Sequence, residues 1–168
     1  MSKEPAMLIL ASFKDEEIAE SAFFDLKMDK RGRLIDFKDA AIVNRDKEDK
    51  LHIKETADLS VGKGVVYGGI IGALIGLIAG PIGAAIGGTA GVVVGGIAAK
   101  NIDAGIPDKR LTEIGATLNS GSSVILVLIE QRWFEPVHTR LEEAGGDVLS
   151  EPLKEEFFEQ FEDDQEGE

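Results

Sequence analysis

Lys63 stands among glycines in the stretch SVGKGV, which resembles the glycine-rich loop that holds nucleotide phosphates. In that loop, G-x-x-x-x-G-K-[ST], the first glycine lets the backbone cradle the phosphates and the Ser or Thr binds Mg²⁺. Ala57 and Gly64 occupy those two positions here, so the spacing does not support phosphate chemistry. No G-x-G-x-x-G pattern follows a predicted strand and opens a helix, as a dinucleotide site requires. We therefore expect no nucleotide site.

The other residue types that commonly catalyse reactions or bind metals are scattered. His52 and His138 fall in a predicted strand and a predicted helix, and each is expected to be an ordinary side chain. Asp36 and Asp39 could together bind a cation beside Lys38, but a polar sheet edge explains them better. The chain has no cysteine, which excludes disulfides, thiol catalysis and cysteine-ligated metals. We expect no catalytic residue, no cofactor and no metal site, and a protein that is not an enzyme.

Aromatic residues cluster at two places late in the chain. Trp133 and Phe134, just before Pro136, are expected to anchor the last predicted helix to the core. Residues 151–168 carry nine Asp or Glu against one Lys, which predicts a solvated, partly disordered acidic tail. Three phenylalanines in this tail could instead dock as one short amphipathic turn, because they are spaced i, i+1 and i+4: Phe157, Phe158 and Phe161.

The charge balance limits the partners of this protein. The formal net charge is −13, which disfavours nucleic acid and bare anionic lipid as partners of the surface as a whole. The first residues, MSKEPAMLIL, lack the basic region, long apolar core and small-residue cleavage site of a signal peptide. Any membrane contact must therefore come from the middle of the chain. The sequence leaves the identity of any small-molecule ligand unknown.

The first part of the chain predicts a strand, a helix and two further strands. AMLILASF, Ala6–Phe13, is a short apolar run typical of a buried strand. Helical spacing follows and ends at Gly32, and Ser12 with Asp15 resembles a capping box. Residues 33–46 and 49–55 alternate as strands do, with a polar loop at 44–50 between them. The residues expected to face inward are Ile18, Ala22, Phe23 and Leu26 in the helix, Ile35, Phe37, Ala41 and Val43 in the next strand, and Leu51 and Ile53 in the last.

The later part of the chain predicts two helices and two strands. Residues 106–121 form a helix between Pro107 and Gly121, followed by a second buried apolar strand at 122–131. Residues 134–146 form the last helix, and 147–152 a short edge strand. The inward faces of the two helices are expected to be Leu111, Ile114 and Leu118 in the first, and Val137, Leu141 and Ala144 in the second.

In order, these elements read β-α-β-β, an insertion, then α-β, with an additional helix and strand at the end. This is the split β-α-β pattern of a ferredoxin-like sandwich, an α+β fold in which helices cover one face of a four-stranded sheet. The two continuous apolar strands, the first and the fourth, fall where that fold places its central pair. We predict a ferredoxin-like α/β domain over residues 1–61 and 101–150, an inserted glycine-zipper helical hairpin over 62–100, and an acidic C-terminal tail over 151–168.

Residues 64–99 are a run of 36 residues without charge, of which twelve are glycine. Glycine recurs at every fourth residue before Pro81 and again after it, so each set lies along one stripe of a helix. Gly80 and Pro81 end one helix and begin the next, which predicts a hairpin of two arms, each ~26 Å long. The residues predicted to pack helix against helix, within a chain or between copies, are Gly64, Gly68, Gly72, Gly76 and Gly80 in the first arm, and Gly83, Gly87, Gly91, Gly95 and Ala99 in the second.

So many glycines weaken a helix, and close packing must offset the loss. Each glycine costs ~1 kcal/mol relative to alanine, or on the order of 12 kcal/mol for all twelve. A smooth stripe lets two helix backbones approach closely, as in membrane GxxxG interfaces. The Val, Ile and Leu side chains must then face lipid or another protein. The apolar residues of the first arm favour membrane insertion by ~4 kcal/mol, whereas the second arm is marginal alone.

Several arrangements satisfy this packing. In the favoured one the hairpin enters a membrane as a unit, flanked by Lys63 and Lys100, and the positive charges of Lys109 and Arg110 place the folded domain in the cytoplasm. The protein is then a non-enzymatic, membrane-associated homo-oligomer, whose partners are lipid and its own copies. Alternatively, hairpins of several copies form the core of a soluble cytoplasmic assembly, such as a ring, shell or filament. A pore is a weaker alternative, as is a monomer that buries the hairpin against its own sheet.

The chain resembles a family of small bacterial proteins of unknown function that insert a glycine-zipper hairpin into a small α/β domain. The resemblance lies in LILASFKDEEIAESAFFDLK, in IVNRD, and above all in GVVYGGIIGALIGLIAGPIGAAIGGTAGVVVGG. Members of this family are often described as predicted membrane or general stress proteins. The resemblance therefore implies a role at the envelope or in the general stress response, and it carries over no catalytic residue.

Overall fold

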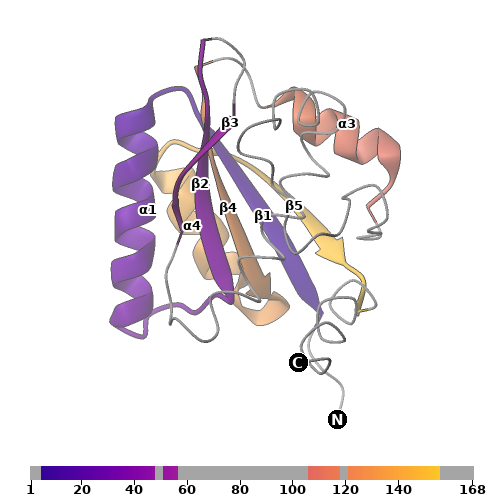
Figure 1. Cartoon of the computed structure of the whole chain (residues 1–168). Helices are drawn as coiled ribbons and strands as arrows, with labels where there is room; N and C mark the ends of the chain where they lie inside the picture. The colour runs from indigo at the N-terminus through magenta and orange to yellow at the C-terminus, as the bar shows by residue number, and fades with distance from the viewer. Residues whose placement is uncertain (1–4, 48–50, 57–105, 118–120, 156–168) are drawn as a thin grey trace, which may run out of the picture.

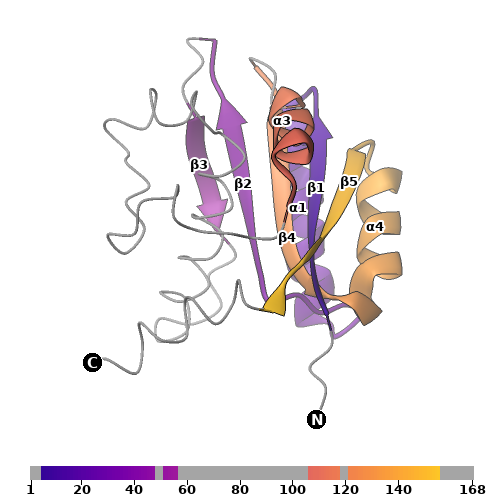
Figure 2. The ribbon, with the colours of Figure 1, turned by 90° about the vertical axis from the view of Figure 1, so that its right-hand side faces the viewer.

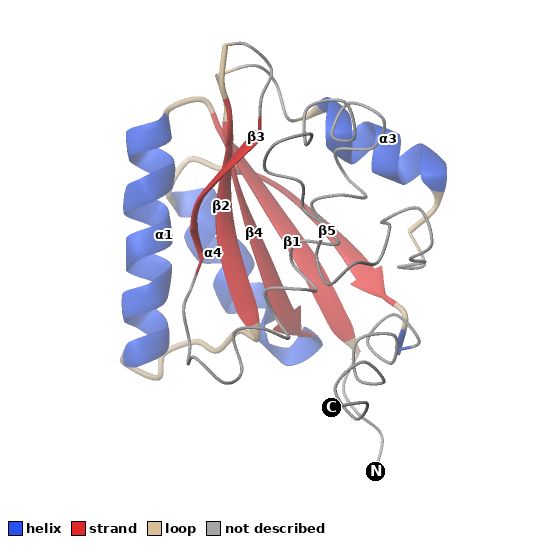
Figure 3. Ribbon diagram, in the orientation of Figure 1, coloured by secondary structure: helices blue, strands red, loops and turns tan. Residues whose placement is uncertain are grey.

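The computed structural model describes residues 5–47, 51–56, 106–117 and 121–155 (Figure 1). Strands and helices combine into a mixed α+β fold (Figure 3). The elements in chain order are β1 (Ala6–Phe13), α1 (Glu16–Arg31), β2 (Asp39–Arg45), β3 (Leu51–Thr56), α3 (Asp108–Ala116), β4 (Ser123–Glu130), the short 3-10 helix η2 (Gln131–Trp133), α4 (Phe134–Glu143) and β5 (Asp147–Leu153).

The strands form one antiparallel sheet in the order β3-β2-β4-β1-β5. The two continuous apolar strands, β1 and β4, are neighbours as predicted, with Leu10 opposite Leu126. β5 is an edge strand, also as predicted, and Pro152 within it lies opposite Met7. It extends to Leu153, so the first residues of the predicted tail, 151–153, pair with β1.

The two faces of the sheet are covered by different helices, since α1 and α4 lie on one side and α3 on the other (Figure 1). The register agrees: Val148 packs toward α1 and α4, so Glu151 points to the opposite face, where Arg110 of α3 pairs with it. The prediction that the helix within 106–121 covers the same face as the first helix is therefore wrong. α4 takes that place, because a sheet that is apolar on both faces accepts an amphipathic helix on either side.

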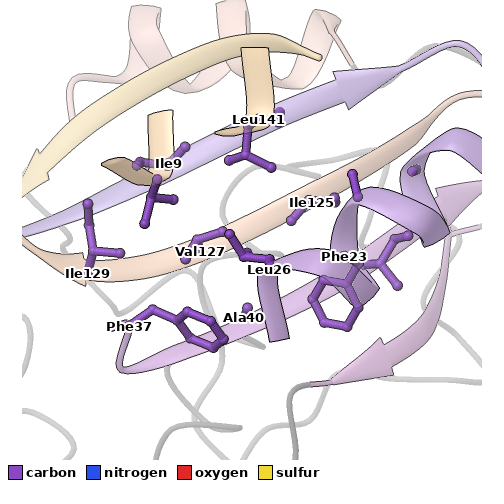
Figure 4. Packing of buried hydrophobic residues seen from close by; sticks show 14 of the residues in the cluster. Ile9, Phe23, Leu26, Phe37, Ala40, Ile125, Val127, Ile129 and Leu141 are labelled. Atoms are coloured by element: carbon purple, nitrogen blue, oxygen red, sulfur yellow. The ribbon is translucent and has the colours of Figure 1, made fainter. Parts of the chain in front are cut away.

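The main core lies between the sheet and the layer formed by α1 and α4 (Figure 4). Alternate residues of β4 point into it, because strand side chains alternate between the two faces. Phe23 of α1 and Leu141 of α4 close the core from the side of the helices, and burying each contributes roughly 1.5–3 kcal/mol. The predicted inward residues Ala22, Leu26 and Val137 are buried as well. The prediction that Ile18 faces inward is wrong, because this residue of α1 is 47% exposed.

Asp15 caps the start of α1, and its carboxylate accepts the backbone N–H of Glu17 at 2.8 Å. The predicted capping box with Ser12 is wrong, because Ser12 belongs to β1 and its hydroxyl donates to the Asp147 carbonyl. A single Asp cap and the glutamates of the first turn therefore stabilise this end of the helix.

α1 ends at Gly32 as predicted, but the left-handed residue is the next one. Arg33 has a φ of 62°, and the amide of Leu34 donates to the Asp29 carbonyl while that of Arg33 donates to Lys30. These are the two hydrogen bonds of a Schellman helix end, in which the left-handed position usually belongs to glycine. Gly32 itself keeps a right-handed φ of −76°.

β2 starts later than predicted, at Asp39, within the segment 33–46 expected to be a strand. Ala41 and Val43 are buried on the face away from α1 and α4, so the prediction that they share a face with Ile35 and Phe37 is wrong. The side chains that do face α1 and α4 from this segment are Ile35, Phe37, Ala40 and Ile42.

α4 ends with the same hydrogen bonds as α1, here with glycine at the left-handed position. Gly145 has a φ of 99° and its amide donates to the Glu142 carbonyl, while the amide of Gly146 donates to Leu141. A Cβ atom on Gly146 would lie 2.8 Å from Cζ of Phe13, closer than carbon atoms pack. Glycine at this position therefore lets the end of α4 approach β1.

Candidate functional site

The residues singled out for helix packing and membrane contact all lie outside the described residues. This holds for both glycine sets and the turn at Gly80 and Pro81, and for the flanking Lys63 and Lys100. Their packing stays a prediction. The structure does place the two elements that the segment connects, β3 before it and α3 after it.

β3 is the edge strand from which the chain enters the glycine-rich segment. It ends at Thr56, opposite Ala41 of β2, and its pairing shifts register between Ile42 and Val43. A register shift of the kind a β-bulge makes bends a strand and increases its twist, here near the end of β3.

α3 is fixed to the domain where the chain returns. Ile106 before the helix and Ile114 within it are buried, and Arg110 pairs with Glu151 of β5 and with Glu113, the latter at 3.2 Å. The Glu151 carboxylate, followed by that of Glu113, raises the pKa of the Arg110 guanidinium above its usual value. The arginine therefore stays charged and ties α3 to the edge of the sheet.

Asp39 is a carboxyl group buried in the sheet, and not part of a polar edge as predicted. It is 5% exposed and accepts the backbone N–H of Ala40 at 2.8 Å. Burial raises the pKa of Asp39 to about 6, because the charged form loses hydration; the Ala40 hydrogen bond and the charge of Lys30 act in the opposite direction. The residues that share its sheet face include Ala41, Val43, Leu126 and Leu128. Asp39 can therefore exchange a proton near pH 6 from a largely aliphatic setting.

Asp36 and Asp39 have different interaction partners, and the two carboxylates do not form a cation site together. Asp36 is exposed, lies 3.0 Å from the Lys30 ammonium and accepts the backbone N–H of Phe37 at 2.9 Å. Lys30 also donates to the Phe37 carbonyl and lies over that ring, 4.4 Å from its centre. These contacts connect the segment before β2 to the end of α1. The negative charge of Asp36 is paired with the Lys30 ammonium.

Lys38, the third member of that candidate, lies 4.0 Å from Glu130, which is itself 2.9 Å from Arg132. Within the described ranges, no three His, Cys, Asp or Glu side chains gather as a metal site requires.

The histidines and the late aromatic pair lie on separate elements. His52 stands in β3 opposite Asn44, and His138 lies on α4. The His138 ring is 5.1 Å from that of Phe134, and its Nδ1 is 3.6 Å from the Glu142 carboxylate. Trp133 and Phe134 pack against the core, which confirms the prediction that they anchor the last helix.

Sequence reasoning missed a group of exposed apolar residues on α1 and just after it. Phe24 is 58% exposed, Met28 44% and Leu34 61%. The spacing of Phe24 and Met28, four residues apart and out of phase with the buried Phe23 and Leu26, is the signal that could have revealed them.

Among the described helices, none has the length and apolarity that crossing a bilayer requires. The predicted hairpin lies outside this part of the chain.

Residues 65–164, more than half of the chain, match the family described as "Protein of unknown function (DUF1269)". The chain belongs to this family. The DUF1269 match begins inside the glycine-rich segment and continues through α3, β4, α4 and β5, so these elements and that segment belong to one family unit. The match confirms the prediction that the chain resembles a family of unknown function. No curated protein and no solved structure matches the chain.

Proposed function

We propose that this DUF1269 protein is a non-enzymatic, membrane-associated homo-oligomer anchored by a glycine-zipper hairpin over residues 62–100. The observation that carries the proposal is the run of 36 uncharged residues with glycine at every fourth position, between Lys63 and Lys100. Close contact between such stripes offsets the low helix propensity of glycine, and lipid accepts the remaining Val, Ile and Leu side chains. A role at the envelope or in the stress response is part of this proposal.

The same proposal assigns the described elements to a ferredoxin-like sandwich with an inserted hairpin. β1, α1, β2, β4, α4 and β5 supply the β-α-β-β-α-β order, and the antiparallel neighbours β2-β4-β1-β5 are consistent with it. β3 and α3 are then additions on either side of the insertion. The elements therefore support a domain that folds around the hairpin and holds both of its ends.

Membrane association is tested by fractionating cells that produce the full-length chain and a variant lacking residues 64–99. The full-length protein should sediment with membranes and need detergent for release, and the deletion variant should not. Full-length protein in the soluble fraction, unchanged by the deletion, would contradict the proposal.

Oligomerisation through the glycine stripe is tested with a matched pair of substitutions. Gly87→Leu changes a stripe position, whereas Gly88→Leu makes the same change one residue outside the stripe. We expect Gly87→Leu to dissociate the oligomer in detergent and Gly88→Leu to leave its mass unchanged, as measured by light scattering. Equal effects of the two substitutions would contradict a stripe-specific interface.

A soluble structural assembly is the second candidate, because glycine stripes could pack hairpins from several copies in water as well. It predicts a large particle without detergent, which light scattering detects directly. A pore would in addition give ion flux across liposomes that is lost in Gly72→Leu and kept in Ala73→Leu.

A further inference from the structure

The surface of α1 that faces away from the sheet carries apolar side chains near the end of the helix. Phe24 and Met28 stand one turn apart on the same side, and both are exposed. Leu34 follows in the turn after the helix. In a Schellman helix end, the residue that stands where Leu34 does commonly packs against the one that stands where Met28 does. We call these three residues the α1 patch. The opposite side of the helix buries Phe23 and Leu26, so the α1 patch faces outward.

Two arginines next to the α1 patch have no acidic partner in the described part of the chain. Arg31 and Arg33 are exposed, and neither side chain has a hydrogen bond or an ion pair there. Lys30, by contrast, is paired with Asp36. Arg33 also holds the left-handed conformation that favours glycine, and such backbone strain is typical of functional positions. The α1 patch therefore has a positive border at its Leu34 end, whereas the exposed Asp25 lies beside Phe24 at its other end, in a chain whose net charge is −13.

The last residues of the chain have the complementary composition. EEFFEQFEDDQEGE, residues 155–168, contains eight acidic residues, no basic residue and three phenylalanines. Carboxylates suit a positive border, and aromatic rings suit a surface of Phe, Met and Leu, since sulfur–aromatic and ring–ring contacts are both favourable.

The topology brings this segment to the correct end of the domain. β1 and β2 are both antiparallel to β4, and α1 connects them, so α1 ends where β2 begins. β5 is antiparallel to β1 and therefore ends at that same end (Figure 2). The last residue of β5, Leu153, and the α1 patch thus share one end of the molecule.

The distance is within reach of the chain. α1 packs over β4, β1 and β2, so its axis lies about two strand spacings, roughly 10 Å, across the sheet from β5. The outer surface of a helix layer stands roughly 15 Å above a sheet, which makes the whole path about 20 Å. The eight residues from Lys154 to Phe161 span up to about 26 Å when extended.

We propose that the acidic C-terminal segment, residues 155–168, docks on the α1 patch of its own chain, with its phenylalanines on Phe24, Met28 and Leu34 and its carboxylates beside Arg31 and Arg33. The interaction is independent of the membrane role proposed above, because it uses neither the hairpin nor an oligomer.

The absence of cysteine makes a direct test possible, since one introduced thiol is unique in the chain. Gly32→Cys places a thiol inside the α1 patch without removing an apolar side chain. A Cβ at this position would lie 3.9 Å from Leu34 Cγ, and its nearest neighbour, the Met28 carbonyl oxygen, would be 3.5 Å away. Glu143→Cys is the control, because it is exposed at the end of α4, which lies at the other end of the domain. The rate of modification by a thiol reagent is measured in the full chain and in chains with Phe157, Phe158 and Phe161 all changed to Ser.

We expect the thiol at position 32 to react about sixfold more slowly in the full chain, which is the protection given by an effective concentration of about 1 mM and a Kd of about 0.2 mM. The three Phe→Ser changes should remove that protection, while the thiol at position 143 reacts equally in all chains. Equal rates at position 32 with and without the phenylalanines would overturn the proposal.

Two other occupants are distinguished by the same measurement. Protection that grows with protein concentration would show that the segment of a second copy covers the patch, which overturns docking within one chain. Protection that is unchanged by the Phe→Ser substitutions, and appears only with vesicles of anionic phospholipid, would assign the patch to a membrane surface and also overturn the proposal.

Discussion

The left-handed backbone conformation at the end of α1 can be tested directly by substitution. Arg33 has a φ of 62°, a conformation that costs an L residue with a side chain roughly 1–2 kcal/mol relative to glycine. Replacing the arginine by glycine removes that cost, but it also lowers stability by about 0.4–1 kcal/mol because glycine gives the unfolded chain more conformational freedom. Arg33→Gly should therefore stabilise the fold by about 0.5–1 kcal/mol.

The residue before it supports a second step. Gly32 has a right-handed φ of −76°, and a Cβ there would meet the Met28 carbonyl oxygen at 3.5 Å and the Asp29 carbonyl oxygen at 3.7 Å, which are ordinary contacts. Gly32→Ala should therefore add about 0.4–1 kcal/mol by restricting the unfolded chain. Together the two substitutions should raise the midpoint of thermal unfolding by about 2–8 °C for a chain of this size.

Urea and thermal unfolding, followed by circular dichroism and by the fluorescence of Trp133, measure both effects. Gly145→Arg is the matched control, because Gly145 holds the same position at the end of α4 with a φ of 99°, and it should destabilise the fold by about 1–2 kcal/mol. If Arg33→Gly destabilised the protein as glycine does within a regular helix, the left-handed assignment would be refuted.

Three further predictions follow from buried or paired groups. Gly146→Ala should destabilise the fold by about 2–3 kcal/mol in urea unfolding, since its Cβ would lie 2.8 Å from Cζ of Phe13, 3.0 Å from the Leu141 carbonyl oxygen and 3.2 Å from a further side chain. Burial raises the pKa of Asp39 to about 6, so the folded state binds this proton more tightly than the unfolded state, and stability falls as the pH rises from about 4 through about 6. Asp39→Asn should abolish that decline and raise the free energy of unfolding at pH 7 by about 3 kcal/mol; an unchanged pH profile would contradict the buried carboxylate. Glu151→Gln should lower the free energy of unfolding by no more than about 1 kcal/mol but speed hydrogen exchange in α3, and unchanged exchange there would show that Arg110 does not fix the helix.

The strands and helices themselves could be predicted where one physical pattern dominated. Ala6–Phe13 and 123–130 are continuous apolar runs because each has a neighbouring strand on both sides and is buried on both faces, and they pair as predicted. The helical period of α1 marked Phe23 and Leu26 as core residues, and both are buried.

Other features could not be predicted because the sequence carries no signal that separates the alternatives. Ala40 through Val43 are all buried, so no alternation of apolar and polar residues sets their phase. The same two-sided burial of the sheet hides which face α3 or α4 covers. The core shared by Leu141 and Phe23 places α4 beside α1, and the pairing of Arg110 with Glu151 places α3 on the other face. The burial of Asp39 was missed because an aspartate at the start of a strand usually stands at a solvated edge. The packing of the glycine-rich segment, the centre of the functional prediction, lies outside the described residues.

Pro152 in the edge strand β5 has a consequence for how copies of this protein can associate. A free strand edge invites another strand to pair with it, but proline has no amide hydrogen to donate, and in a strand it belongs where that amide would have pointed to solvent. A second sheet could not extend this one continuously along β5 without losing a bond there. Under the proposed association through hairpins, this edge would keep neighbouring copies from joining their sheets into one continuous ribbon of strands on this side.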